Sequence, residues 1–572
     1  MGGGSKTVPA GKCLVHLSIN TVDRQNLSTA SWTVTATGKS YTAEADATGR
    51  ADLLVDSGAT YTATLTHQGN YYNDSPQTFV ANSTGVIWCY FDLFQYPDVK
   101  TVVYVTTSDP GVTVTATSGS NTMTAVSGAD SVAEFDGLAT GSTWTFSIGR
   151  QTRTVVIDRL LIHVDMSARM PTINTVSFGM SFNSSTFSTD PKGCLTYTGG
   201  CAGFTPVSSP PSSLGRCGTL GSWDMNADGS SSNPLLDSCF YATFDAEGTL
   251  HQLLNPKDLT QIIALWDEDG GGGWRDASGT SAIQSENTMF CFPALFRKGT
   301  SSSVTIGTTS ESGTAYGATI DGHTFQFEAI GVYEGYVNGT KLMSLSGKAS
   351  SANIKRSTFR TYAAANPVKN GKAMLWNFHQ WRDWWHLYLF AAKSFNGQVA
   401  IGQGGFTYNG SAGQGLCDKM GLWAGSSSTT SSTSTSVKAL IENPWGYKFE
   451  FIDDFINNGA GTIYAGQSGI PTDAISAGKL NTVFPTASGW QKGLNSSGAF
   501  WGIGSGTGGS STTHQCDYMW STSTLDLYLG RVGGYSGRVS NGSAGPSCLN
   551  ASNSLSNSDS NNGARLAFVF DL

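Results

Sequence analysis

The sequence predicts a mainly β protein in which two immunoglobulin-like β-sandwiches precede a larger α+β domain. The first observation is an internal repeat, because one sequence unit recurs within the first 168 residues at an offset of 80. The second is a period-2 alternation of apolar and hydroxyl-bearing residues in both copies, as in half-buried strands. The third is a change near Met170, after which long Gly/Ser-rich loops accompany the clearest helical patterns. We therefore expect sandwiches over residues 1–98 and 99–168 and one domain over residues 169–572.

The repeated unit consists of short strands. The residues Thr33 to Thr37 read Thr-Val-Thr-Ala-Thr, and the same run returns at Thr113 to Thr117. Further along each copy, apolar residues alternate with polar ones: Tyr61, Ala63 and Leu65 in the first, Trp144, Phe146 and Ile148 in the second. Short alternating strands between Gly, Asn and Asp turns are typical of immunoglobulin-like sandwiches. Since neither copy carries a marked chemical site, we expect both to be spacers.

Two helices are predicted in the larger domain. Ser357 is the expected N-cap of the first, which stops before the next proline. The second is expected from Leu375 to Asn396, where the following glycine completes a C-cap signal. Its apolar residues recur at i+3 and i+4, so we expect most of its circumference to be buried. His379 and His386 on this helix are assigned to packing, because no partner at metal-ligand spacing accompanies them.

Two polar segments interrupt the larger domain. Only Ser and Thr occur from Ser426 to Ser436, which predicts an exposed loop inside the domain. Ten of the thirteen residues from Asn550 to Asn562 are Asn or Ser. A closing strand follows at once, in which one set of residues is expected to face the core and the other to face solvent: Leu566, Phe568 and Phe570 against Arg565, Ala567 and Val569.

Charge and hydropathy exclude two classes of partner. The net charge is −8, charged residues make up only 13% of the chain, and no Lys/Arg cluster is present. A nucleic-acid partner is therefore not expected. No apolar run approaches the length of a membrane span or of a signal peptide, so we expect a soluble protein without membrane insertion.

Cysteines and acidic residues leave two questions open. The ten cysteines include no C-x-x-C pair, but Cys194–Cys201 and Cys217–Cys239 are both spaced for a bridge in a Gly/Ser/Pro-rich region. Asp224, Asn226 and Asp228 match the first half of a calcium loop, although Leu235 stands at the twelfth position, where a Glu ligand is required. The sequence decides neither point, and we assign no metal and no cofactor.

The sequence gives no positive sign of an enzyme, and we assign no catalytic residue. Glycan cleavage needs two carboxylates in one cleft, for which Asp453-Asp454 and Asp267-Glu268-Asp269 are the candidates. Both runs lie in turn-like or Gly-rich contexts that favour solvated carboxylates. Neither a G-x-S-x-G elbow nor an H-E-x-x-H helix is present.

A resemblance adds to these patterns over roughly the last 320 residues. The segments that carry it occur in the order LLNPKDL, IGVYEGYVNGTKLMSLSG, STFRTYAAAN, NGQVAIGQGG, IENPWGYKFEFIDDF, LGRVGG and SNSDSNNGARL. This order resembles phage tail-associated proteins of the C-type-lectin-like class, the variable proteins that diversity-generating retroelements diversify. The resemblance implies a C-type-lectin-like fold, also found in formylglycine-generating enzymes. Those enzymes use a closely spaced cysteine pair, whereas Cys516 and Cys548 are 32 apart here, so their catalysis is not expected.

In the family that this chain resembles, a C-terminal strand closes the sheet and the segment before it displays diversified side chains. Adenine-directed mutagenesis leaves Asn and Ser at such positions. Gly563 to Leu566 match the fixed scaffold. The positions that match the diversified, ligand-binding pattern are Tyr535, Ser536, Gly537, Arg538, Ser540, Asn541, Ser547, Cys548, Asn550 and Ser552. Tyr and Arg suit a binding surface, because they supply large amphipathic contact area and several hydrogen bonds. We expect the side chains of five of them to reach solvent on one contiguous surface: Tyr535, Arg538, Ser547, Asn550 and Ser552.

The resemblance implies a phage virion adhesin on a tail fibre or tail tip, made in the bacterial cytoplasm. Its expected partners are a bacterial surface protein or glycan and other virion tail proteins. Polar β spacers with a terminal binding head favour a homotrimer, since three copies strengthen a weak single-site affinity. Two alternatives stay open: a structural tail or baseplate protein without receptor binding, and a polysaccharide-cleaving tail enzyme.

Overall fold

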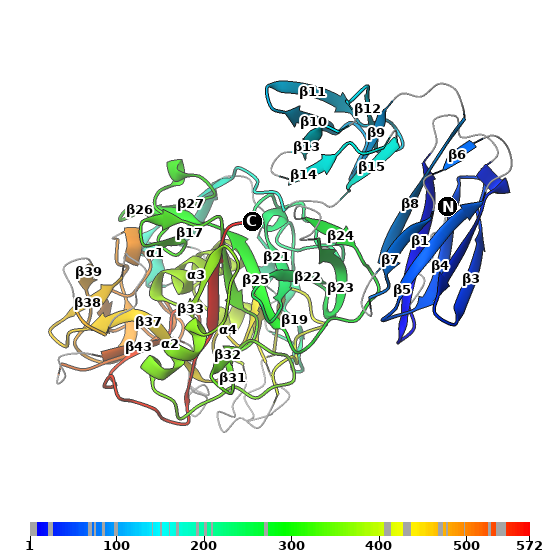
Figure 1. Cartoon of the computed structure of the whole chain (residues 1–572). Helices are drawn as coiled ribbons and strands as arrows, with labels where there is room; N and C mark the ends of the chain where they lie inside the picture. Colours follow the sequence, from blue (N-terminus) through cyan, green and yellow to red (C-terminus); the bar gives the residue numbers. More distant parts are fainter. Residues whose placement is uncertain are drawn as a thin grey trace. The chain divides into compact units, whose positions relative to one another are not determined.

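A computed structural model gives the architecture (Figure 1). It describes the chain except residues 1–7, 21–26, 67–70, 74–75, 83–85, 96–100, 140, 149–150, 160, 168–170, 190–193, 199–202, 207–209, 268–272, 405–412, 427–435, 467–472, 476–478, 497, 524–527 and 533–544. The chain forms two compact units. Unit 1 comprises residues 1–170 and 266–279, and unit 2 comprises residues 171–265 and 280–572. The protein is mainly β in both units.

Unit 1 contains two β-sandwiches with matching strand orders, apart from β6, which has no counterpart in the described part of the second. In the first, the sheet β4-β1-β8-β6 faces the sheet β3-β2-β5-β7, and one core joins them. In the second, β12-β9-β15 faces β11-β10-β13-β14. Strand β1 pairs in parallel with β8, as β9 does with β15. The strands are β1 Lys12–Asn20, β2 Ser31–Ala36, β3 Lys39–Glu44, β4 Arg50–Asp56, β5 Thr60–Thr66, β6 Tyr71–Asn73, β7 Gln77–Val80, β8 Val86–Gln95, β9 Val102–Thr107, β10 Thr113–Ser118, β11 Asn121–Val126, β12 Val132–Asp136, β13 Thr143–Ile148, β14 Gln151–Val156 and β15 Leu161–Met166.

The sequence repeat therefore corresponds to a repeat in topology. The repeated Thr-Val-Thr-Ala-Thr run lies in β2 and in β10, and each of these strands is hydrogen-bonded between equivalent neighbours. Alternating burial follows the predicted period, since Tyr61, Ala63 and Leu65 of β5 are buried between more exposed threonines. In β13, Trp144 and Phe146 are buried in the same way. The predicted period-2 strands are confirmed in both copies.

Unit 2 is built around two large sheets. One contains the strands β23-β22-β21-β25-β30-β46-β33 in that order. The other has the order β39-β38-β37-β43-β44-β42-β40-β41, and β45 pairs in parallel with β37. The strands of the first are β21 Phe240–Phe244, β22 Leu250–Asn255, β23 Asp258–Trp266, β25 Asn287–Pro293, β30 Phe327–Gly331, β33 Gly371–Leu375 and β46 Leu566–Phe570. Those of the second are β37 Phe449–Asn457, β38 Thr462–Ala465, β39 Leu480–Val483, β40 Gly489–Lys492, β41 Gly506–Thr507, β42 Tyr518–Ser521, β43 Tyr528–Val532, β44 Leu549–Ala551 and β45 Asn562–Gly563.

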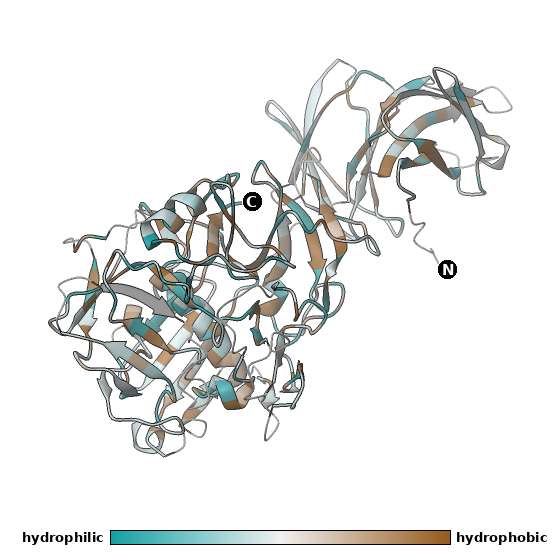
Figure 2. Cartoon of the chain, turned by 90° about the horizontal axis from the view of Figure 1, so that it is seen from below, coloured by the Kyte–Doolittle hydropathy of each residue, from teal (hydrophilic) through white to brown (hydrophobic). Residues whose placement is uncertain are grey.

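Smaller sheets complete unit 2. A four-stranded sheet has the order β17-β16-β27-β26, and another has β19-β34-β35-β36. Their strands are β16 Ser177–Phe182, β17 Leu195–Thr198, β19 Gly215–Arg216, β26 Phe296–Gly299, β27 Ser303–Gly307, β34 Trp423–Gly425, β35 Lys438–Ala439 and β36 Ile441–Glu442. The helices are α1 Ser184–Phe187, α2 Arg356–Ala364, α3 Phe378–Ala392 and α4 Gly397–Ala400. In Figure 2, hydrophobic residues gather on strands of the interior, whereas connecting segments are largely polar.

The C-terminal strand β46 is a central strand, red in Figure 1, and not the half-buried strand that the sequence predicts. It pairs with β30 on one side and β33 on the other. Phe568 lies edge-to-face against Phe244, and Phe570 stacks on Phe327. The residues predicted to face solvent are buried as well, because Arg565, Ala567 and Val569 are each 0% exposed. Unit 2 covers both faces of this strand, so alternation in the sequence did not reveal its burial.

Both predicted helices exist, but their starts differ from the prediction. The second also ends earlier than expected, at Ala392, because Lys393 is its C-cap and Asn396 is the N-cap of α4. The N-cap of α2 is Lys355 and not Ser357, which lies in the first turn. Helix α3 begins three residues after Leu375, because Leu375 ends β33; Asn377 caps it through a capping box. All fifteen residues of α3 are buried, which includes His379 and His386. Their assignment to packing is confirmed, and burial lowers the pKa of His379 to about 3.

The Ser/Thr run is buried where the structure describes it. Ser426 and Ser436, its two ends, are each 2% exposed. The expected exposure is wrong at these ends, because both belong to the packed surroundings of β34 and β35. Residues 427–435 lie outside the described residues.

Candidate functional site

The strands β43 and β44 frame the predicted binding segment. They pair antiparallel through Arg531 with Asn550 and Val532 with Leu549, in the middle of a sheet. The connection between them contains Tyr535, Ser536, Gly537, Arg538, Ser540 and Asn541, and these six residues lie outside the described residues. The structure thus describes the base of this connection, which is held by two adjacent central strands.

The C-terminal end of the connection is fixed in the core. The backbone N–H of Ser547 donates to the Asp517 carboxylate at 2.7 Å, and its hydroxyl accepts from Trp385 Nε1 at 3.0 Å. Its carbonyl accepts from Gln491 Nε2. Pro546 packs against Gly397 so closely that a Cβ on that glycine would lie 2.4 Å from the proline ring. Every polar group of Ser547 is thus engaged, which leaves it no role in a solvent contact.

The expected exposure is therefore wrong at two of the predicted binding residues, Ser547 and Asn550. Ser547 and Asn550 are 3% and 6% exposed, and Cys548, another predicted binding residue, is 0% exposed. The physical reason is that β44 is a central strand, so the residues that enter it pack between neighbours. Ser552 is partly exposed, and its N–H and hydroxyl donate to Asn550 Oδ1 at 3.1 and 2.9 Å. This turn ends β44 and begins the Asn/Ser-rich stretch.

The Asn/Ser-rich stretch is an ordered surface segment. Exposed positions within it are Ser554, Ser556, Asp559 and Ser560. Its far end is tied to the fold, because the N–H of Phe449 donates to the carbonyl of Asn561 at 2.9 Å. Hydrogen bonds between nearby side chains stabilise the stretch in place of strand pairing. Asn557 Nδ2, for example, donates to Asp559 Oδ2 at 2.8 Å.

Arg565 is the anchor between this stretch and β46. Its Nε donates to Glu450 Oε2 at 2.9 Å, and Nη2 pairs with the other carboxylate oxygen. The remaining donors bind the carbonyls of Gly331, Val332 and Glu442 at 2.8, 3.0 and 2.8 Å. All five guanidinium N–H groups are thereby satisfied in a fully buried site. Since Glu450 lies on β37 and Gly331 on β30, this one side chain ties the two large sheets together.

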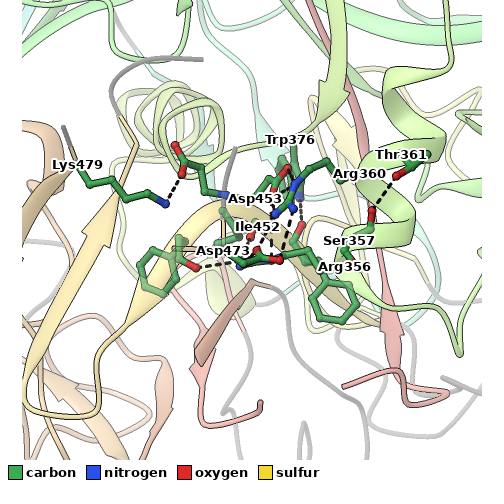
Figure 3. Close-up of polar contacts among 12 residues, drawn as sticks. Arg356, Ser357, Arg360, Thr361, Trp376, Ile452, Asp453, Asp473 and Lys479 are labelled. Atoms are coloured by element: carbon green, nitrogen blue, oxygen red, sulfur yellow. Dashed lines mark hydrogen bonds and ion pairs between the residues drawn. The ribbon is translucent and has the colours of Figure 1, made fainter. Parts of the chain in front are cut away.

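A second cluster links β37 to α2 through Arg356 and Arg360 of that helix (Figure 3). The pairing of β37 with β43 is interrupted between Ile452 and Ile456, a bulge in which Asp454 takes a left-handed φ of 55°. Arg356 fills this break, since its Nη1 donates to the carbonyls of Ile452 and Phe455, each at 2.9 Å. The bulge is therefore held by side-chain donors where the ladder is absent.

The carboxylates of this cluster are all paired. Arg360 binds both oxygens of Asp453, at 3.0 and 2.8 Å from Nε, and also reaches Asp473 at 2.7 Å (Figure 3). Lys479 pairs with Asp454. Burial would raise the pKa of Asp473, but Arg360 and Arg356 hold it down at about 2. Asp453 and Asp454, the candidate catalytic pair, thus serve as structural ion-pair partners here.

We expect Arg360→Ala to lower the free energy of unfolding of unit 2 by roughly 2–4 kcal/mol, because Asp453 stays buried after its bidentate partner is lost. Lys372→Ala is the matched control, since its ion pair with Asp321 is exposed and worth at most about 1 kcal/mol. Chemical denaturation of both variants measures the difference. Equal losses in the two would contradict this assignment.

Buried carboxyl groups near Arg565 favour the protonated form. Burial, with nearby Glu450, raises the pKa of Glu334 to about 8. Burial also raises the pKa of Glu442 to about 7, although the N–H groups of Cys417 and Gly415 oppose the shift. The folded protein therefore binds these protons more tightly than the unfolded chain does. The contribution of these two groups to the stability of the fold is complete below about pH 4.5, the pKa of an unfolded Glu. It is lost as the pH rises through their folded-state pKa values of about 7 and about 8.

Unit 2 should consequently lose roughly 2 kcal/mol of stability between pH 6.5 and pH 8, at one pKa unit per 1.36 kcal/mol. Below that window, the buried neutral histidines oppose the trend, because unfolded histidine takes up protons. Melting curves across the window test this, with Glu334→Gln expected to flatten the decline. Glu311→Gln, at an exposed carboxylate, is the control. A melting temperature that does not fall in the parent would refute the prediction.

The open questions on cysteines and calcium have structural answers where residues are described. Cys217 and Cys239 form no bridge, and their thiols donate to the carbonyls of Ile401 and Leu235 at 2.8 and 3.2 Å. In the other candidate pair, Cys194–Cys201, Cys201 lies outside the described residues. Asp224 pairs with Lys257 and Arg216. Within the described ranges, no group of three or more His, Cys, Asp or Glu side chains is placed to hold a metal ion.

The remaining acidic candidate has a cationic partner as well. Asp267 pairs with Arg275 in unit 1, while Glu268 and Asp269 lie outside the described residues. Among the helices that the structure describes, none is long and apolar enough to cross a membrane.

Sequence reasoning missed a row of aromatic residues on the sheet that holds β43 and β44. Trp490 on β40 and Tyr518 and Trp520 on β42 are all partly exposed. The available signal was the run Tyr518-Met519-Trp520, in which aromatic residues flank one that is 0% exposed. Their neighbourhood in space arises from pairing between strands far apart in the sequence, which the pattern does not show.

Comparisons with known proteins assign no family. No protein-family model matches the sequence, and no curated protein matches it. Three solved structures have some similarity to this chain. The Bacillus anthracis TIE protein is 14% identical, over 31% of this chain and 40% of that one, and the TM-score is 0.14. The shaft pilin SpaA of Lactobacillus rhamnosus GG is 8% identical, over 27% of this chain and 97% of that one, and the TM-score is 0.13. BcpA, the major pilin subunit of Bacillus cereus, is 13% identical, over 30% of this chain and 77% of that one, and the TM-score is 0.14. Such low scores carry no conclusion about this chain.

Proposed function

We propose that this chain is a phage virion adhesin that binds a bacterial surface receptor through the β43–β44 connection. Immunoglobulin-like spacers would precede a C-type-lectin-like head that carries this connection. The observation that carries the proposal is the fixed base of the connection, where Ser547 is held by Asp517, Trp385 and Gln491. A segment with a rigid base can change its sequence without cost to the core, as a diversified binding segment requires.

The arrangement of Arg565 supports the same proposal. The resemblance assigns Gly563 to Leu566 to a fixed scaffold, and Arg565 satisfies all its donors between the two large sheets. If the segment before β46 varies in sequence, Arg565 must stay the same to hold the fold together. The pairing of Asp453, Asp454 and Asp473 with Arg and Lys also favours binding over glycan cleavage, which needs a free carboxyl pair.

The test is attachment of the purified protein to a panel of bacterial strains. We expect Tyr535→Ala and Arg538→Ala to weaken attachment at least tenfold. The melting temperature should change no more than it does for a typical exposed substitution. Ser556→Ala, in the exposed Asn/Ser-rich stretch, is the control. A parent protein that attaches to none of the strains, or variants that attach like the parent, would refute the proposal and favour a structural tail protein.

Two further measurements bear on the assembly and on the origin of the segment. Sedimentation should give a trimer, and monomer alone at micromolar concentration would contradict the proposed homotrimer. A reverse-transcriptase gene with a near-identical copy of the segment's coding sequence should lie beside this gene. Its absence would remove the case for diversification but not for receptor binding.

A further inference from the structure

Three aromatic side chains form a row across one face of the sheet. Trp490 and Tyr518 are cross-strand partners, with ring centroids 5.6 Å apart at an interplanar angle of 82°. Tyr518 and Trp520 lie 4.8 Å apart at 50°. Phe449 of β37 meets Trp520 edge-to-face at 5.5 Å. The row therefore crosses β40 and β42 and ends against β37.

The row faces outward. Met519 and Gln491, which alternate with the three aromatic residues, are 0% and 1% exposed and point into the core. By the alternation of a strand, Trp490, Tyr518 and Trp520 belong to the opposite face, where they are partly exposed. Their rings meet at steep angles and not as parallel stacks, so the contacts between neighbours are made largely by ring edges.

The polar ends of these rings are available to a ligand. Among the described residues, the indole N–H groups of Trp490 and Trp520 and the Tyr518 hydroxyl have no hydrogen-bond partner. Buried Tyr and Trp normally find a partner for these groups, so three unpaired donors at a surface leave room for one from outside. The row thus combines ring faces with hydrogen-bond donors at their rims.

The row lies next to the strand that follows the binding connection. Strand β42 pairs in parallel with β44, and Trp520 is the cross-strand partner of Asn550. Asn550 in turn pairs with Arg531 of β43. One sheet therefore carries both the row and the base of the β43–β44 connection.

We propose that Trp490, Tyr518 and Trp520 form a subsite for a bacterial surface glycan. This inference rests on the proposed function, because it names the receptor class. A sugar ring presents an apolar C–H face surrounded by hydroxyl groups, and that pattern matches ring faces rimmed by unpaired donors. Lys492 is the only charged residue in β40 and β42. Stacking of nucleic-acid bases would require a basic groove along the row, which these strands do not supply.

The experiment measures binding to an array of purified bacterial surface polysaccharides. We expect Tyr518→Ala to weaken binding at least tenfold, and Tyr518→Phe, which keeps the ring, to weaken it only a few-fold. Trp88→Ala is the matched control, since Trp88 is 43% exposed in unit 1 and lies outside the row. Melting curves establish that each variant is folded. Polysaccharide binding by Tyr518→Ala equal to that of the parent would overturn the inference.

Cell attachment separates this inference from the proposed function. Attachment of the parent should survive protease treatment of the cells and be lost after periodate oxidation of their glycans. Loss on protease treatment with survival after periodate would identify a protein receptor, which overturns the glycan subsite and leaves the adhesin proposal intact. No attachment to any strain would instead refute the adhesin proposal itself.

Discussion

Arg565→Ala should destabilise unit 2 by about 3–5 kcal/mol, because removal of one partner from a buried ion pair leaves an uncompensated charge. Glu450, the partner, is 1% exposed, and the carbonyls of Gly331, Val332 and Glu442 lose their donors at the same time. Each buried acceptor left without a partner adds to the cost. The melting transition of the unit that contains β46 is the measurement.

Two other variants make the Arg565 experiment specific. Arg565→Lys keeps the positive charge but cannot supply five donors in a plane, so we expect it to recover only part of the loss. Arg216→Ala removes an arginine whose side chain is 40% exposed in the same unit, and it should change stability by less than about 1 kcal/mol. An Arg565→Ala protein that melts like the parent would show that the guanidinium does not join the sheets.

The second large effect is expected at Phe568. Its ring is 0% exposed in a central strand and lies 4.9 Å from Phe244, so Phe568→Ala loses transfer free energy and leaves a cavity. Such substitutions cost about 3–5 kcal/mol. Denaturant unfolding of unit 2 checks this, with Val483→Ala as the control at a side chain that is 69% exposed.

The Phe568 result also bears on how β46 is buried. Val569 points to the opposite face and is equally buried. We therefore expect Val569→Ala to be destabilising too, in contrast to a strand with one solvent face. If Phe568→Ala were costly and Val569→Ala were neutral, the strand would have the half-buried character that the sequence alone suggests.

The Asn/Ser-rich stretch shows how far composition alone can lead. Its amino-acid content is typical of a disordered tail, yet local side-chain bonds and the tie from Phe449 to Asn561 hold it in place. The sequence predicts correctly that the stretch is polar and partly exposed. Its order depends on a partner about a hundred residues away, which no local pattern encodes.

By itself, the sequence determined the elements whose signal is local. The repeat, the period-2 strands of both sandwiches and the burial of α3 follow from spacing within short windows, and the structure has them all. Only the tertiary structure decided which strand is central, and hence that Ser547, Asn550 and Arg565 are buried. Burial depends on what lies on both sides of a strand, and neighbours such as β30, β33 and β37 come from distant parts of the chain. Strand pairing also brings Trp490 and Tyr518 together on one sheet, although they lie far apart in the sequence.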